Sequence, residues 1–473
     1  MGIGFDEITL SIGFTFSLID GISHSLFGPL FPYRSIEAGI PQNWIGLAMS
    51  AFDVAILITT FIQLHCLHPS LFKHVFCLGA LLKGVSLAMF GLAGFLQTES
   101  FLLLSIVSNF GYGIGTSMTW STMFAIMASS NPLWVSRVTT SCQQLYILGQ
   151  LLGPLISAVT FNYSDYEAIF CSTGLVSLCG CCAAVCFLKP ISEQHIFHMK
   201  DFKHEHHDGL KFCKCIMGSR ECIAVLCSVL ILGICLGTLE SVLSIHLLQM
   251  YHFHQTFICL MFTGFYMSYA FFHSILNTLI KFLNPLLIST SAFICAIAGF
   301  LTLIATLYFE SKFKFVFNFV GLVLIAYALL AFLSPSYLLT EMFYCERLNI
   351  VNDADSHARF YICGAITAVN CFGHLIGCLV FGGILMMNNG FVRSLSTLCC
   401  ILALFGIVYV CVVGCGMKKI RSLRNEYRSE VGTSILTYPS LMIGEEEDIE
   451  NAFITNYIGN SLRLNNNLDF YFV

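Results

Sequence analysis

The chain has 473 residues, of which 57% are hydrophobic and 10% are charged, and its formal net charge is −5. A mean hydropathy of +0.80 excludes an ordinary soluble domain and indicates an integral membrane protein. Most of the 23 cysteines lie inside apolar stretches, where they pack as small apolar residues, so we expect no disulfide framework.

Apolar runs long enough to span a bilayer follow one another along the chain. About 20 apolar residues cross a membrane as a helix, and these runs are too long and too uniformly apolar for β-barrel strands. Asp6 and Glu7 precede the first run, which we expect to be a permanent anchor rather than a cleaved signal. The sequence predicts an all-α membrane protein with twelve transmembrane helices, at residues 8–32, 44–64, 71–96, 101–127, 139–161, 166–188, 222–250, 256–280, 285–308, 313–341, 359–387 and 391–416.

The polar segments divide these helices six and six. Residues 1–188 form an N-terminal half, 189–221 a central loop, 222–416 a C-terminal half and 417–473 a polar tail that we expect to be disordered. Most of the 22 Lys and Arg fall on one side, which places both termini and the central loop in the cytoplasm. Two six-helix halves are typical of transporters built from repeats.

The two halves share weak internal similarity. The fifth helix carries Gly149, Gly153 and Pro154, and the eleventh carries Gly373 and Gly377. Small residues four apart let helix backbones approach closely, so we expect tight helix contacts at the same place in each half.

Four segments resemble one family. Leu26–Pro32, Trp44–Leu47, Leu148–Pro154 and Leu239–Leu247 resemble the first helices, the Gly-rich antiporter motif and the acid-bearing segment of the vesicular amine and polyamine transporters. These are a branch of the major facilitator superfamily. The resemblance implies that the chain is a secondary transporter of a small organic cation, working by alternating access, and it leaves proton antiport as an open question.

The sequence departs from the family pattern at three places. The loop at 64–73 lacks the usual Gly-x-x-x-Asp-x-x-Gly-Arg motif and keeps only the basic Lys73. Asn109 stands where the family usually has a buried Arg linked to proton coupling. Ser157 and Ala158 replace the second Gly pair of the antiporter motif. These differences favour an alternative, an uncoupled facilitator, and they also allow a transporter-like sensor or scaffold without transport activity.

Buried carboxylates are the first candidates for the site. Asp20, with His24 one turn away, lies near the middle of the first span, and Glu240 lies within the seventh. A mid-bilayer carboxylate is costly unless it is protonated, paired or facing water, so it indicates a functional site. We predict that Asp20 and Glu240 bind substrate or protons, the alternative being neutral, hydrogen-bonded residues that join helices.

Other polar residues within the spans have both structural and functional interpretations. We expect Asp53 and Lys83 to form a structural ion pair with each other. His374 is a candidate for a proton route because histidine titrates near neutral pH, although a lone intramembrane His often only bridges helices. Glu341 is either a cytoplasmic gate residue or a solvated helix end.

Several classes of function have no support in the sequence. The central loop holds many His and Cys residues, but their spacing matches no four-ligand zinc pattern, so we predict no metal site. No Gly-rich loop ends in Gly-Lys-Ser, and no nucleophile–base pattern is present, so we expect no enzyme, no cofactor and no nucleic-acid partner. The loop residues in question are His195, His198, His204, His206, His207, Cys213 and Cys215.

The tail carries one short motif. Tyr438–Leu441 fits a Tyr-x-x-apolar sorting signal, which predicts binding to sorting adaptors and residence in endosomal, lysosomal or secretory-vesicle membranes, with the plasma membrane as the alternative.

Overall fold

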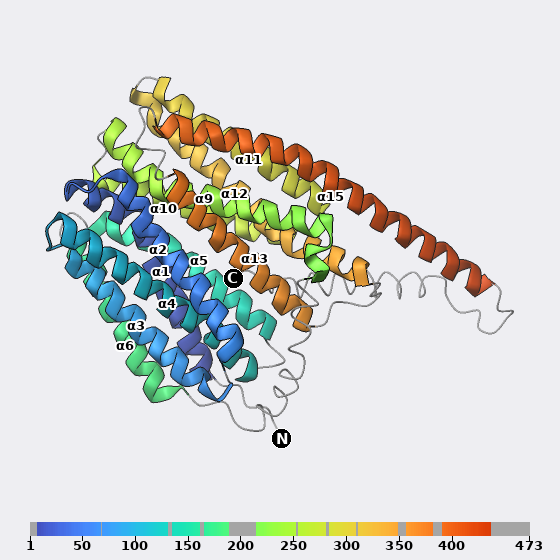
Figure 1. The fold of residues 1–473 in the computed structure, drawn as a ribbon, viewed down its shortest axis with the longest axis horizontal. Helices are drawn as coiled ribbons and strands as arrows, with labels where there is room; N and C mark the ends of the chain where they lie inside the picture. The colour runs from blue at the N-terminus through green and yellow to red at the C-terminus, as the bar shows by residue number, and fades with distance from the viewer. Residues whose placement is uncertain are drawn as a thin grey trace.

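The structure is a computed structural model that describes residues 7–67, 69–130, 135–160, 165–188, 214–251, 254–280, 283–308, 311–348, 356–381 and 390–436. Within these ranges every regular element is a helix (Figure 1). The N-terminal half contains α1 (Glu7–Glu37), α2 (Gln42–Cys66), the short 3-10 helix η1 (Pro69–Leu71), α3 (Phe72–Ala93), α4 (Thr98–Ser130), α5 (Val135–Thr160) and α6 (Tyr166–Phe187). The C-terminal half contains α9 (Arg220–Tyr251), α10 (Gln255–Leu279), α11 (Pro285–Ala305), the 3-10 helix η2 (Thr306–Tyr308), α12 (Ser311–Leu348), α13 (Ser356–Ile376), the π-helix η3 (Gly377–Phe381) and α15 (Gly390–Leu436).

The helices coincide with the twelve apolar runs. Across the described ranges, eleven are long and apolar enough to cross a membrane. The run at 139–161 corresponds to α5, which lies outside those eleven and carries Gln143, Gln144 and Gln150. α5 packs along α1 in its own half and α10 in the other half. The all-α membrane architecture is therefore confirmed.

The last helix extends beyond its expected end. We expected a disordered tail from residue 417, but α15 continues to Leu436, and Figure 1 shows it projecting past the bundle. Lys, Arg and Glu, which are abundant in this stretch, are good helix formers even though they are polar, so loss of hydropathy does not end the helix. The motif at Tyr438–Leu441 lies outside the described residues, as do the central-loop residues 189–213.

Glycines hold the same pair of helices together in each half. A side chain at Gly149 would overlap the Leu18 carbonyl of α1, and one at Gly153 would overlap Ser25. In the C-terminal half, a side chain at Gly373 would overlap the Leu230 carbonyl of α9, and one at Gly377 the Ile234 carbonyl. The α1–α5 and α9–α13 pairs are therefore equivalent contacts, as the glycine spacing predicts.

The two halves lie side by side (Figure 1), each with its own hydrophobic core. Helices α1, α2 and α5 of the first half contact α9, α10 and α13 of the second. The interface thus brings together the helices that carry most of the buried polar residues.

Candidate functional site

The first buried ion pair lies within the N-terminal half. Lys83 Nζ, on α3, donates to Asp20 Oδ1 on α1 and lies 3.2 Å from Thr119 Oγ1 on α4. Both charged side chains are buried. The expected pairing of Lys83 with Asp53 is therefore wrong, because the rotation of α3 points Lys83 at α1 rather than α2. Lys83 and Asp20 thus form an ion pair inside the core of the N-terminal half.

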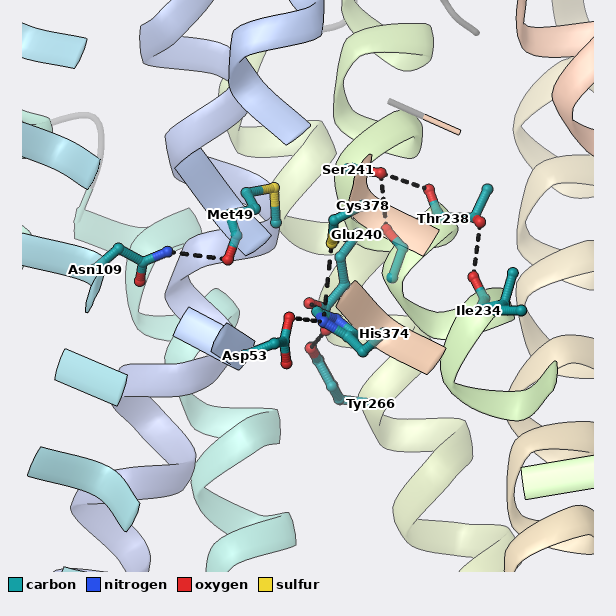
Figure 2. A network of polar contacts seen from close by, with 11 residues as sticks. Met49, Asp53, Asn109, Ile234, Thr238, Glu240, Ser241, Tyr266, His374 and Cys378 are labelled. Atoms are coloured by element: carbon teal, nitrogen blue, oxygen red, sulfur yellow. Dashed lines mark hydrogen bonds and ion pairs between the residues drawn. The ribbon is translucent and has the colours of Figure 1, made fainter. Parts of the chain in front are cut away.

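The second cluster crosses the interface between the halves, as Figure 2 shows. His374 of α13 lies between two carboxylates: its Nδ1 is 2.7 Å from Asp53 Oδ2 on α2, and its Nε2 is 3.2 Å from Glu240 Oε2 on α9. Tyr266 of α10 donates to Glu240 Oε1 at 3.3 Å. All four residues are buried. An imidazole that donates from both nitrogens satisfies both carboxylates, so the geometry suits an imidazolium.

Cys378 completes this cluster. Its Sγ lies 3.8 Å from His374 Nδ1 and 3.5 Å from the Gly237 carbonyl oxygen. Cys378 belongs to η3, which continues α13 with a wider turn. Figure 2 shows the Cys378 sulfur and the Asp53 carboxylate both joined to the imidazole of His374 by dashed lines.

Glu240 also lines a small cavity. Its volume is about 60 Å³, room for several water molecules or the head of a small solute. Apart from Gln150 of α5, the lining belongs to the C-terminal half and includes Glu240, Tyr266, Tyr269 and Asn370. The cavity therefore combines one carboxylate with aromatic rings at the interface of the two halves.

Gln150 was not a candidate from the sequence. The glycine contacts make Gly149 of α5 and Gly373 of α13 equivalent positions in the two halves, so Gln150 and His374, each one residue later, are equivalent as well. A polar residue follows a motif glycine in both the fifth and the eleventh helix, but this pattern alone does not mark a site.

The remaining candidates lie around these two clusters. Asn109 donates its amide to the backbone carbonyls of Ala48 and Met49 on α2, at 2.8 and 3.2 Å. This side chain joins α4 to α2, and Figure 2 shows its amide directed at Met49. His24 is packed near the rings of Phe52 and Tyr146.

Glu341 and the motif proline have different surroundings. Glu341 lies near the end of α12, partly exposed, and the cavity lining does not include it. Pro154 lies inside α5, one residue after Gly153. Gly149 and Gly153 thus shape the α1–α5 contact, and the cavity lining includes none of the three motif residues.

A further link between the halves lies at the end of the bundle where α1 and α9 end. Pro32 has no amide hydrogen, so the Gly28 carbonyl four residues earlier loses its normal helical donor. Ser244 Oγ of α9 donates to this oxygen at 2.7 Å. Gln255 Nε2 of α10 donates to the neighbouring Pro29 carbonyl at 2.9 Å. The C-terminal half thus supplies a donor to the Gly28 oxygen, which Pro32 leaves without its helical donor, and a second donor to the Pro29 oxygen.

Comparison with known proteins gives weak sequence similarity. No family model matches the chain. The MFS-type transporter SLC18B1 of Mus musculus is 23% identical over 256 residues, 53% of this chain and 52% of the relative. The Homo sapiens protein of the same name is 22% identical over 249 residues, 52% of each chain. The chain thus matches these relatives over about half of their length.

Solved structures resemble the whole bundle. A D-xylose-proton symporter has a TM-score of 0.65 at 11% identity, over 86% of this chain and 97% of its own. The nucleoside transporter NupG has a TM-score of 0.63 at 13% identity, over 86% and 99%. The human organic anion transporter MFSD10 has a TM-score of 0.52 at 14% identity, over 85% and 99%. This chain has the fold of the major facilitator superfamily transporters.

Proposed function

We propose that the protein is a secondary transporter that moves a small organic cation across a membrane by alternating access. The observation that carries the proposal is the buried Glu240 carboxylate, which faces a cavity at the interface of the two halves. A charged group at this depth is costly unless it serves a ligand or a partner.

The cavity chemistry suits an ammonium group. Glu240 would bind the positive charge directly, while the faces of Tyr266 and Tyr269 would stabilise it through cation–π contacts. Gln150 and Asn370 would supply hydrogen bonds to other polar atoms of the solute. Glu240 is hydrogen-bonded to Tyr266 and His374, which are neutral or cationic partners that an ammonium group can replace.

The cross-interface contacts suit alternating access. Glu240, Tyr266 and His374 belong to one half, and Asp53 and Gln150 to the other. Rocking one half against the other around a central site would lengthen the His374–Asp53 contact. Solute binding at Glu240 would change the environment of His374 and so act on this contact directly.

Proton antiport is the more specific part of the proposal. Asn109 lacks the charge of the family's Arg, but Lys83 supplies a buried cation in the same half and holds Asp20. A proton arriving at Asp20 would break this pair and leave Lys83 without its partner, which changes the packing of α1 against α3 and α4. The basic residues on one side of the spans support cytoplasmic termini, and a vesicle membrane would supply the proton gradient.

The test is uptake of radiolabelled amines and neutral analogues of the same size into proteoliposomes with an imposed pH gradient. Amine uptake that rises with the gradient supports antiport. Amine flux that follows only the solute gradient and ignores an ionophore selects the uncoupled facilitator. Thermal stabilisation by an amine without any flux selects the sensor or scaffold and contradicts the transport proposal.

A further inference from the structure

Three side chains with metal-ligand chemistry meet beside Glu240. Asp53 of α2, His374 of α13 and Cys378 of η3 are buried, and one ligand atom from each lies within 4.8 Å of the other two. They offer a carboxylate oxygen, an imidazole nitrogen and a thiol sulfur, the donor types that zinc binds.

The spacing fits a tetrahedral ion after a small adjustment. Zinc–ligand bonds of about 2.0–2.3 Å place tetrahedral ligand atoms roughly 3.3–3.7 Å apart. The Cys378 Sγ to His374 Nδ1 distance is 3.8 Å, and the His374 Nδ1 to Asp53 Oδ2 distance is 2.7 Å. The Asp53 side chain would therefore move away from the imidazole by about half an ångström to admit the ion.

Glu240 supplies an independent sign of a metal site. A metal-binding histidine usually donates its second ring N–H to a carboxylate, which fixes the ring and its tautomer. His374 Nε2 lies 3.2 Å from Glu240 Oε2, and Tyr266 in turn holds the other Glu240 oxygen. The Nδ1 atom thus faces Asp53 and Cys378, while the Nε2 atom is held by the Glu240 carboxylate.

We propose that Asp53, His374 and Cys378 bind a transition-metal dication such as Zn²⁺, with water or a solute atom as the fourth ligand. The ion would displace the proton on Nδ1 and the thiol proton, so that two protons leave as the 2+ ion enters. One ligand comes from the N-terminal half and two from the C-terminal half. Metal binding would therefore hold the halves in the arrangement of this structure, whichever solute the protein carries.

The test uses Co²⁺ as a coloured probe for the full-length protein, purified in detergent. A thiolate-bound tetrahedral Co²⁺ gives a sulfur-to-metal charge-transfer band and strong visible bands. Cys378→Ser should remove the charge-transfer band of this site, and Asp53→Asn should weaken Co²⁺ binding at least tenfold. Glu240→Gln should weaken binding by about 10- to 100-fold, as expected for a supporting carboxylate.

Cys235→Ser is the matched control, because Cys235 is also a buried cysteine of the C-terminal half but lies outside the cluster. Melting curves without metal show whether each variant folds. If Cys378→Ser does not fold, the loss of Co²⁺ binding in Asp53→Asn tests the proposal instead. The proposal also requires Zn²⁺ to raise the melting temperature of the wild type and not of Cys378→Ser. An unchanged Co²⁺ spectrum in Cys378→Ser, or an equal loss in Cys235→Ser, overturns it.

Discussion

His374 Nδ1 lies 2.7 Å from Asp53 Oδ2, across the interface between the two halves of the bundle. These residues are 321 positions apart in the sequence. Their contact, extended through Glu240 and Tyr266, connects the cavity of one half to the facing helix of the other. A movement of the halves that separates α2 from α13 would therefore break this contact of the buried His374.

The Asp20–Lys83 pair provides a stability prediction. Lys83→Met should destabilise the protein by about 3–5 kcal/mol, because it leaves the Asp20 carboxylate buried and unpaired. Asp20→Asn combined with Lys83→Met should recover most of this loss, since neither charge then remains. Denaturant unfolding in detergent measures both. A single mutant as stable as the wild type would show that Asp20 is already neutral.

The glycine contacts provide a second prediction. Gly373→Ala should destabilise the protein by about 1–3 kcal/mol, because the added methyl group overlaps the Leu230 carbonyl of α9. Gly364→Ala is the matched control on the same helix, with no atom within 4 Å of the added carbon. There the higher helix propensity of Ala should leave stability unchanged or slightly raised. Equal effects of the two changes would contradict the close contact of α9 and α13.

Ser244 provides a third prediction. Ser244→Ala should cost about 1–3 kcal/mol, because the Gly28 carbonyl would be left buried without a donor. Ser241→Ala is the control: the Ser241 hydroxyl donates within its own helix, at 2.7 Å to the Gly237 oxygen, and its removal should cost well under 1 kcal/mol. Thermal unfolding of the two variants compares them. If Ser244→Ala and Ser241→Ala have the same melting temperature, the Ser244–Gly28 hydrogen bond does not stabilise the protein.

The sequence predicted the helices well and their partners poorly. Span boundaries follow from the length of apolar runs, a local property, and all twelve runs became helices. The partner of Lys83 depends on how α3 is rotated about its axis, and apolar residues on every face of that helix give no periodicity that fixes the rotation. The pairing of Asp53 with His374 depends in addition on how the halves dock, so the sequence could not reveal it.

The candidate site residues also differ in whether a local feature of the sequence indicates them. Glu240 was a candidate from the sequence because a carboxylate in an apolar run is costly, and its role as a binding residue stays a prediction. Gln150 and Cys378 were not candidates, because a Gln beside a glycine motif or one Cys among 23 carries no such signal. Only their positions next to Asn370 and His374 in the folded bundle distinguish them.

The central claim is that the Glu240 carboxylate binds the cationic solute, and amine uptake by Glu240→Gln tests it most directly. Removing the charge while keeping the side-chain shape should reduce amine uptake by about 10- to 100-fold, the loss expected for one charge-assisted contact. Glu99→Gln, at an exposed carboxylate near the start of α4, should transport like the wild type. Amine uptake by Glu240→Gln at the wild-type rate would contradict the account.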